Sequence, residues 1–161
     1  MKKLLASFLT LLFLSASVFA GTINSYDKHG SKSGSYKTYG STTTKYNKYG
    51  SKEKTYKKSG NKTTEYNKYG SKTATYKKSG RTTTKYDKYG KKQATYKTSG
   101  STTNVYDKYG RKTGYYKKKS NGKVLEYDKY GRKVGTYKYQ RKRSTYGNRW
   151  CKSWCRSSKD Q

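Results

Sequence analysis

The sequence lacks proline altogether and has few acidic side chains. Forty lysine and arginine residues stand against eight aspartates and glutamates, which gives a formal net charge of +32. The chain has one histidine and two cysteines. No nucleophile is paired with a base at motif spacing, so we expect no catalytic residue and no cofactor. We expect no metal site either, because one would need more ligands and the single histidine, His29, lies far along the sequence from the two cysteines. An enzyme is therefore not the expected class of function.

Apolar residues are concentrated at the N terminus. Lys2 and Lys3 precede an apolar run over residues 4–13, and small residues around Val18 and Ala20 follow it. This order is typical of a secretory signal peptide, and the run is shorter than a membrane-spanning helix. We predict a signal peptide over residues 1–20, cleavage after Ala20, and a secreted, periplasmic or cell-surface location. An uncleaved anchor is the alternative.

Beyond residue 20, aliphatic side chains are scarce. They are Ile23, Ala74, Ala94, Val105, Val124, Leu125 and Val134. An ordinary hydrophobic core cannot be assembled from so small a set. The abundance of Lys, Gly, Ser and Thr is typical of disordered chains, whereas 21 tyrosines and many threonines favour strands. A folded sheet and a chain disordered in isolation are both compatible with this composition.

Residues 21–140 form one repeat region. A tyrosine followed by Asp or Asn and, four positions after the tyrosine, by glycine recurs about every twenty residues, and only the last copy is shifted by one. Such fixed-period self-similarity indicates one short structural unit copied many times. The anchor tyrosines are Tyr26, Tyr46, Tyr66, Tyr86, Tyr106 and Tyr127.

Each repeat consists of two ten-residue halves, and ten residues suffice for a short strand and a tight turn. Asn47 and Gly50 have the spacing of a type I turn followed by a G1 bulge. The repeated aspartates are accordingly interpreted as turn-starting residues. If every turn follows this rule, Tyr46 lies opposite Lys52 and Tyr56 lies opposite Lys62.

The sequence thus predicts an all-β fold, an antiparallel meander of about a dozen short hairpin strands. The sheet is expected to be a single layer or to curl. Because side chains alternate between faces, turns of this one kind would place all repeat tyrosines on one face, with lysine stems packed on their rings. The opposite face, with Thr, Ser, Lys, Asn and an occasional Glu, would be solvated.

Two segments carry a local resemblance to a known family. Residues 106–111 and 127–132 read Y-D-K-Y-G-R, which resembles the core of the YD repeats of rearrangement-hotspot and teneurin-type surface proteins. The resemblance implies β-hairpin repeats and an exported setting. Lys112 and Lys133 stand where that family usually has an aliphatic residue, and 141 residues are too few for the large encapsulating shells that its members build.

Lysines interleaved with tyrosines are the strongest functional signal. Periodic cations beside aromatic rings provide charge neutralisation and stacking surfaces for an acidic polymer. The expected partners are lipopolysaccharide, acidic polysaccharide, teichoic acid or extracellular DNA. The alternative is that the lysines only keep a tyrosine-rich sheet soluble. The predicted polyanion-binding residues are Lys48, Tyr49, Lys52, Lys68, Tyr69, Lys72, Lys88, Tyr89, Lys92, Lys108, Tyr109, Arg111 and Arg132.

Loop-tip tyrosines are expected to stand exposed at one end of the sheet, with His29 in the equivalent place of the first copy. Stacking contacts and mere tolerance of any residue in the turn explain them equally well. They are Tyr39, Tyr49, Tyr69, Tyr89, Tyr109 and Tyr130.

Residues 141–161 form a basic tail outside the repeat. It holds Cys151 and Cys155, which we expect to form a small disulfide loop in an exported protein, although an intermolecular bond is also compatible. Trp150 and Trp154 lie beside basic residues and suit an anchor at an anionic membrane surface or a cap on the last strand.

Three classes of function follow from these features. The first is an exported, non-enzymatic repeat protein that binds polyanionic envelope or matrix polymers. The second is a structural surface protein whose tyrosine ladders self-associate. The third is a membrane-active cationic protein that relies on the tryptophan tail.

Overall fold

The computed structural model describes residues 21–140, all of which belong to strands and the turns between them. The predicted signal peptide with its cleavage site, and the basic tail with its disulfide, lie outside the described residues. The strands are β1 (Gly21–Asp27), β2 (Lys32–Tyr39), β3 (Thr42–Asn47), β4 (Lys52–Ser59), β5 (Lys62–Asn67), β6 (Lys72–Ser79), β7 (Thr82–Asp87), β8 (Lys92–Ser99), β9 (Thr102–Asp107), β10 (Lys112–Lys118), β11 (Val124–Asp128) and β12 (Lys133–Gln140).

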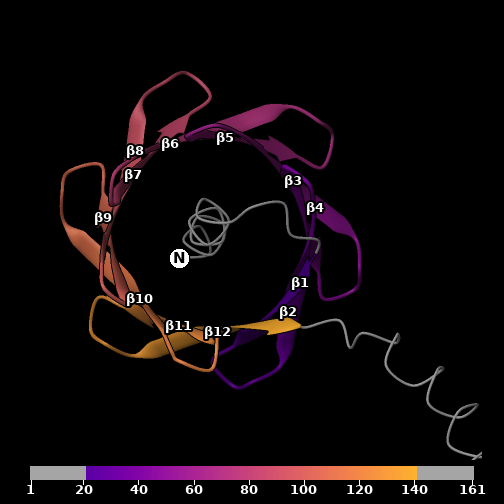
Figure 1. Cartoon of the computed structure of the whole chain (residues 1–161), viewed down its shortest axis with the longest axis vertical. Coiled ribbons are helices and arrows are strands. Elements are labelled where there is room, and N and C mark those ends of the chain that lie inside the picture. The colour runs from indigo at the N-terminus through magenta and orange to yellow at the C-terminus, as the bar shows by residue number, and fades with distance from the viewer. Residues whose placement is uncertain (1–20, 141–161) are drawn as a thin grey trace, which may run out of the picture.

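The strands form an antiparallel meander that closes into a barrel. Each strand pairs with its neighbours in sequence, and β1 pairs in addition with β12, from Thr22 opposite Gln140 to Asp27 opposite Gly135. Figure 1 shows the result as a ring of strands in which the first and last colours of the repeat region meet. The prediction of an all-β meander is confirmed, and the curled form of the sheet is realised as full closure.

Two kinds of turn alternate around the barrel. The turns after β1, β3, β5, β7, β9 and β11 have the predicted type I geometry with a G1 bulge. After β3, for example, the Gly50 amide donates to the Asn47 carbonyl at 3.1 Å, the Asn47 amide donates to the Ser51 carbonyl at 2.9 Å, and Gly50 has a φ of 84°. We call the barrel end at which these six turns lie the tip end.

Most turns at the opposite end are of another kind. Gly60 has a φ of 55° and begins a two-residue turn, while no residue other than glycine has a positive φ among residues 21–140. Glycine at the first central position is typical of a type II′ turn. Ser59 therefore pairs with Lys62, and Tyr56 lies opposite Glu65. The prediction that Tyr56 lies opposite Lys62 was wrong, because the two halves of the repeat use different turns.

A β-bulge after each tip-end turn changes which face the following residues occupy. Tyr46 lies opposite Lys52 as predicted, but Lys45 lies opposite Lys54, so Glu53 is an extra residue with no register partner on β3. The extra residue shifts the alternation by one. Tyr56 consequently shares a face with Thr43 and not with Tyr46. The prediction of a one-faced tyrosine array was therefore wrong.

The tyrosines form two sets on the two faces of the barrel wall. The inner tyrosines face the barrel interior and are at most 2% exposed: Tyr36, Tyr56, Tyr76, Tyr96, Tyr116 and Tyr137. Ile23, Ala74, Val105 and Val124 complete this core. The outer tyrosines are half-buried: Tyr26, Tyr46, Tyr66, Tyr86, Tyr106 and Tyr127. The core of this chain is thus made largely of aromatic side chains that carry hydroxyl groups.

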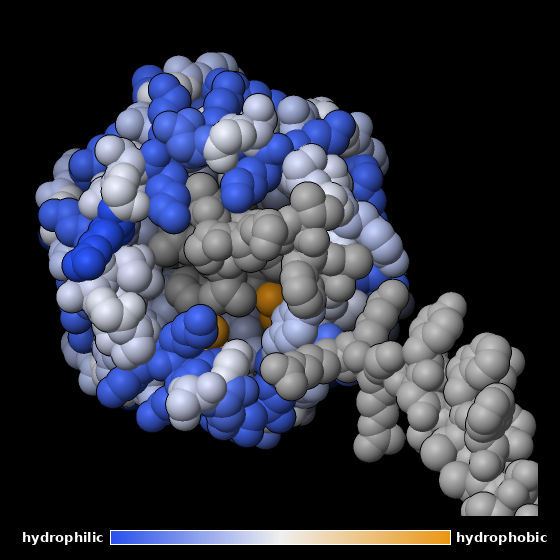
Figure 2. Space-filling model, viewed as in Figure 1, coloured by the Kyte–Doolittle hydropathy of each residue, from blue (hydrophilic) through white to orange (hydrophobic). Residues whose placement is uncertain are grey.

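The outer surface is hydrophilic. Figure 2 shows polar and charged residues over the visible face, with the few strongly hydrophobic atoms in view at the central opening. Residues 21–140 contain 31 of the basic residues and seven of the acidic ones, which leaves a formal charge of +24 on the barrel. No helix in this part of the chain is long and apolar enough to cross a membrane.

Candidate functional site

The tip end of the barrel brings together every residue that the sequence analysis singled out for polyanion binding. Lys48 and Tyr49 lie in the turn after β3, Lys52 begins β4, and the same three positions recur in the next hairpins. Arg111 and Arg132 follow the turn glycines of the last two copies. All of these residues are exposed. The structure therefore places the predicted residues on one ring-shaped surface, which we call the tip surface.

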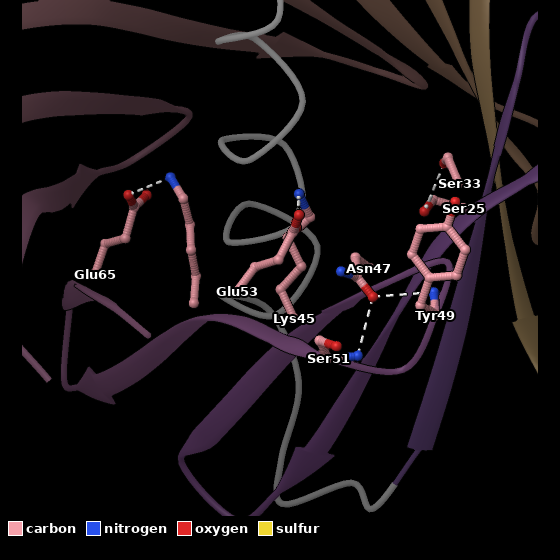
Figure 3. A network of polar contacts seen from close by, with 9 residues as sticks. Ser25, Ser33, Lys45, Asn47, Tyr49, Ser51, Glu53 and Glu65 are labelled. Atoms are coloured by element: carbon pink, nitrogen blue, oxygen red, sulfur yellow. Dashed lines mark hydrogen bonds and ion pairs between the residues drawn. The ribbon is translucent and has the colours of Figure 1, made fainter. Parts of the chain in front are cut away.

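Side-chain hydrogen bonds hold each tip in one conformation. In the turn after β3, Asn47 Oδ1 accepts hydrogen bonds from the backbone amides of Tyr49 and Ser51, both at 2.9 Å (Figure 3). Asp87 makes the equivalent bonds to the amides of Tyr89 and Lys91. Short Asx side chains commonly stabilise turns in this way. The tip side chains are thus presented from a loop backbone that the Asx side chain hydrogen-bonds at two amides.

Each tip tyrosine carries a lysine over its ring. The Nζ atom of Lys48 lies 4.8 Å from the ring centroid of Tyr49, and the distance from Lys88 to Tyr89 is 4.6 Å. The tip tyrosines are between 69% and 79% exposed: Tyr49, Tyr69, Tyr89, Tyr109 and Tyr130. Exposed cation–π contacts contribute about 0.5–1 kcal/mol each. They keep a charge and an aromatic surface side by side in solvent.

The last two tips carry an additional arginine. Arg111 Nε lies 2.8 Å from Asp107 Oδ2, and the guanidinium carbon lies 5.1 Å from the ring centroid of Tyr109. Desolvation acts to raise the pKa of Asp107, but hydrogen bonds from the backbone and side chain of Arg111 and from the Tyr109 amide lower it below its ordinary value. Arg132 repeats the ion pair with Asp128 at 2.8 Å.

Tyr39 does not belong to the tip surface. It ends β2 beside the two-residue turn at Gly40, at the other end of the barrel, and is 69% exposed. Its assignment to the loop tips was therefore wrong, because Tyr39 belongs to the half of the repeat whose turn lies at the opposite end, where Ser59 stands in the next copy. His29 does lie in the first tip, where it takes the place of the tyrosine; its amide donates to Asp27 Oδ1 at 2.9 Å.

A second Lys/Tyr array surrounds the barrel wall. Lys37 lies over the outer tyrosine Tyr46 at 5.2 Å, and Lys138 lies over Tyr26 at 4.6 Å across the β1–β12 seam. Lysines also pack on Tyr66, Tyr86 and Tyr106, each at 5.6 Å. The lysine over the Tyr46 ring is thus a diagonal neighbour and not its register partner Lys52. In the sixth copy, Tyr127 stacks on Tyr115 at 4.7 Å instead.

The interior of the barrel contains charged groups that the sequence analysis had placed on a solvated face. Lys54 Nζ lies 2.6 Å from Glu65 Oε1, and Tyr76 donates to Glu65 Oε2 at 2.8 Å. Lys45 pairs with the bulge residue Glu53 at 2.6 Å (Figure 3). Burial alone would raise the pKa of Glu65, but the bond and charge of Lys54, with Lys85 and Tyr76, lower it below its ordinary value. The expected solvated face is therefore corrected to a polar interior.

Glu126 is a buried carboxylate in a different environment. It is 5% exposed, and it accepts hydrogen bonds from Tyr116 at 3.1 Å and from Tyr137 at 3.0 Å. No lysine or arginine of residues 21–140 forms an ion pair with it. Burial raises the pKa of Glu126, and the two tyrosine hydrogen bonds only partly oppose this effect.

A cleft of about 810 Å³ extends from the tip surface to this carboxylate. Its most buried lining residues are Val105, Tyr116 and Glu126, and its exposed lining includes Lys28 and Lys133. The cleft lies in the sector where β1, β9, β10, β11 and β12 meet the tip end. Volumes of about 300–1,000 Å³ are usual for small-molecule pockets.

The periodic sequence pattern predicts the tip residues but not the cleft. Val105, Tyr116 and Glu126 were treated as members of a repeat, whereas the cleft arises where individual copies depart from it. Lys45, Glu65 and Lys85 occupy the position of Val105 in earlier copies. A copy-by-copy comparison of this position could have pointed to the sector.

The comparisons with known proteins assign no family to this chain. No protein-family model matches the chain, and no curated protein sequence is significantly similar to it. In the part of the chain that the structure describes, no group of three or more His, Cys, Asp or Glu side chains could hold a metal ion.

Proposed function

We propose that this protein is an exported, non-enzymatic barrel that binds acidic polymers of a cell envelope or extracellular matrix on its tip surface. The observation that carries the proposal is the clustering of exposed lysines and tyrosines in five turns at one end of a closed ring. A polymer that follows the ring would meet alternating cations and aromatic surfaces. Lipopolysaccharide, acidic polysaccharide, teichoic acid and extracellular DNA all present suitable charge.

Two physical terms support binding at this surface. Release of counterions from a polyanion favours association with clustered lysines and weakens steeply with salt. Stacking on exposed aromatic rings is less sensitive to salt and contributes about 1–3 kcal/mol per stacked base in single-stranded nucleic acids. A site that combines the two should retain some affinity at physiological salt.

The structural, self-associating alternative gains no support from strand edges. Strands β1 and β12 pair with each other over six register positions, so none of the twelve described strands has a free edge. Edge-to-edge pairing is the usual route by which sheets form fibres. Self-association would have to use side chains on the barrel surface.

The test is a binding titration of the purified protein against lipopolysaccharide, teichoic acid, an acidic polysaccharide, DNA and a neutral glycan at several salt concentrations. The double variant Tyr69→Ala/Tyr89→Ala should weaken binding to the preferred acidic polymer about tenfold or more. Tyr39→Ala is the matched control, because Tyr39 is as exposed as Tyr109 but lies at the other end. Equal, salt-abolished binding to every polyanion, unaffected by the tip variants, would contradict the proposal.

A further inference from the structure

The barrel departs from its repeat in one sector, and that sector is where the cleft lies. In each repeat, two positions close to the tip end have side chains that face the barrel interior. The first precedes each outer tyrosine and holds Ser25, Lys45, Glu65, Lys85, Val105 and Glu126. The second lies two residues before each inner tyrosine and holds Gly34, Lys54, Ala74, Ala94, Gly114 and Gly135.

These substitutions make room on one side of the interior. The second position is glycine in β10, β12 and β2, whereas β4, β6 and β8 carry lysine or alanine there. The three strands with glycine lie on one side of the barrel, with only β11 and β1 between them. A Cβ atom at Gly135 would lie only 3.1 Å from Glu126 Oε2. The glycine therefore leaves space for the carboxylate, and no lysine from the neighbouring copies reaches into the same sector as an ion-pair partner.

The chemistry of the cleft is asymmetric from base to rim. At the base, each oxygen of the Glu126 carboxylate accepts one tyrosine hydrogen bond, which leaves further lone pairs for donors brought by a ligand. At the rim, Lys28, Lys129 and Lys133 are exposed cations, whereas the carboxylates Asp107 and Asp128 in the lining are each paired with an arginine. Aliphatic lining is limited to Val105 and Val134. A ligand that fits both ends must carry hydrogen-bond donors at one end and an anion at the other.

We propose that this cleft binds a single hexose unit that carries a phosphate or carboxylate group, with sugar hydroxyl or amino groups donating to Glu126 and the anionic group held by Lys28 and Lys133. The inference rests on the proposed function in that such units occur in acidic polysaccharides, teichoic acids and lipopolysaccharide. It assigns the cleft to one sugar residue of the polymer, while the tip surface contacts the rest of the chain.

The experiment is calorimetric titration of the purified protein with glucosamine 6-phosphate, glucose 6-phosphate, glucuronic acid, glucose and uridine monophosphate. The anionic sugars should bind more tightly than glucose. Lys133→Ser should weaken their binding about fivefold, and Glu126→Gln about tenfold. Lys62→Ser is the control for Lys133→Ser, because Lys62 is exposed and begins a strand as Lys133 does, but lies at the opposite end of the barrel and does not line the cleft.

Val105→Lys offers an independent variant. It installs the residue found at this position in two other copies and fills the cleft, so it should abolish sugar binding. Because Lys133 is exposed, the Lys133→Ser comparison remains decisive even where Val105→Lys does not fold. Equal affinity for glucose and glucose 6-phosphate, tighter binding of uridine monophosphate than of the sugar phosphates, or equal effects of Lys133→Ser and Lys62→Ser would each overturn the inference.

Polymer binding and sugar binding, measured on the same purified protein, distinguish the two proposals. Polymer binding that is sensitive to Tyr69→Ala/Tyr89→Ala, together with no binding of any acidic sugar, overturns the cleft assignment and leaves the tip surface as proposed. Sugar binding that is sensitive to Lys133→Ser, together with no polymer binding, supports the cleft and contradicts the tip surface.

Discussion

Tyr46 and Tyr56 occupy matching positions ten residues apart in the repeat, yet their side chains lie on opposite faces of the barrel wall. The cause is Glu53, the extra residue of the β-bulge between them. A bulge in every repeat sends one tyrosine of each pair inward and the other outward. The barrel thereby acquires an aromatic interior and an aromatic exterior from a single sequence pattern.

This division predicts unequal costs of removing the two kinds of tyrosine. Tyr76→Ala should lower the free energy of unfolding by about 3–5 kcal/mol, because it empties space at a side chain that is 0% exposed. Tyr46→Ala should cost about 1 kcal/mol, since it removes mainly a cation–π contact with Lys37. Urea unfolding of both variants measures the difference, and equal losses would contradict the two-face arrangement.

The two interior glutamates predict opposite dependences of stability on pH. The pKa of Glu65 is lowered on folding, so its contribution is present above the unfolded pKa and is lost as pH falls through the folded pKa. The pKa of Glu126 is raised, so the folded state binds more protons and stability falls as pH rises from the unfolded to the folded pKa.

Glutamine substitutions test these signs. Glu65→Gln should lower the free energy of unfolding at neutral pH by about 1–3 kcal/mol, and this loss should shrink in acid. Glu126→Gln should be stabilised relative to the parent protein increasingly as pH rises from acid to neutral. Chemical unfolding between acid and neutral pH gives both curves, and parallel curves for the two variants would contradict the assignment.

Glycines at the tip end and inside the wall should differ in their tolerance of alanine. Gly50→Ala meets no atom within 4 Å but forces a side chain into a φ of 84°, which costs about 1–2 kcal/mol. Gly34→Ala should cost more, because its Cβ would lie 2.5 Å from the Tyr46 carbonyl oxygen. Thermal unfolding compares them. A larger loss for Gly50→Ala would contradict the close approach of β2 and β3.

Closure of the barrel predicts a specific cross-link. Asn24 and Lys138 are register partners across the β1–β12 seam, and partners in an antiparallel pair have Cα separations within the range of disulfides. Asn24→Cys combined with Lys138→Cys should form a bond under mild oxidation, identified by peptide mass mapping that also follows Cys151 and Cys155. Asn24→Cys with Lys97→Cys is the control pair and should not form one.

The sequence predicts much of this fold because turn chemistry is local. The Asn47–Gly50 spacing correctly predicts the tip turns, their register with Lys52 and the number of strands. The face of the barrel wall that each side chain occupies is harder to predict, because it depends on the one bulge residue of each repeat and on two-residue turns such as the one at Gly60. The bulge residue has no signature in the sequence. Gly60 followed by Asn61 is typical of a two-residue hairpin turn, but a single turn rule applied to both halves of the repeat does not use it, and a shift of one residue exchanges the two faces.

The candidate site also combines residues that the sequence pattern predicts with residues that only the three-dimensional arrangement brings together. The tip residues follow from periodicity and are found together in space. Glu126 does not follow from periodicity, because its hydrogen-bond partners Tyr116 and Tyr137 come from the strands on either side of β11 and all three side chains must face inward. The position of Lys28 beside the cleft requires the β1–β12 seam.

The β1–β12 seam also means that the order of strands along the sequence can be changed. Because β1 and β12 pair as any two neighbours do, the barrel has no strand that must come first. A circular permutant that joins the two ends of the repeat region by a short linker and opens at Gly80–Arg81 would keep all twelve pairings. Its order of strands in sequence would change, while the ring of tips and the sector that holds Glu126 would stay where they are.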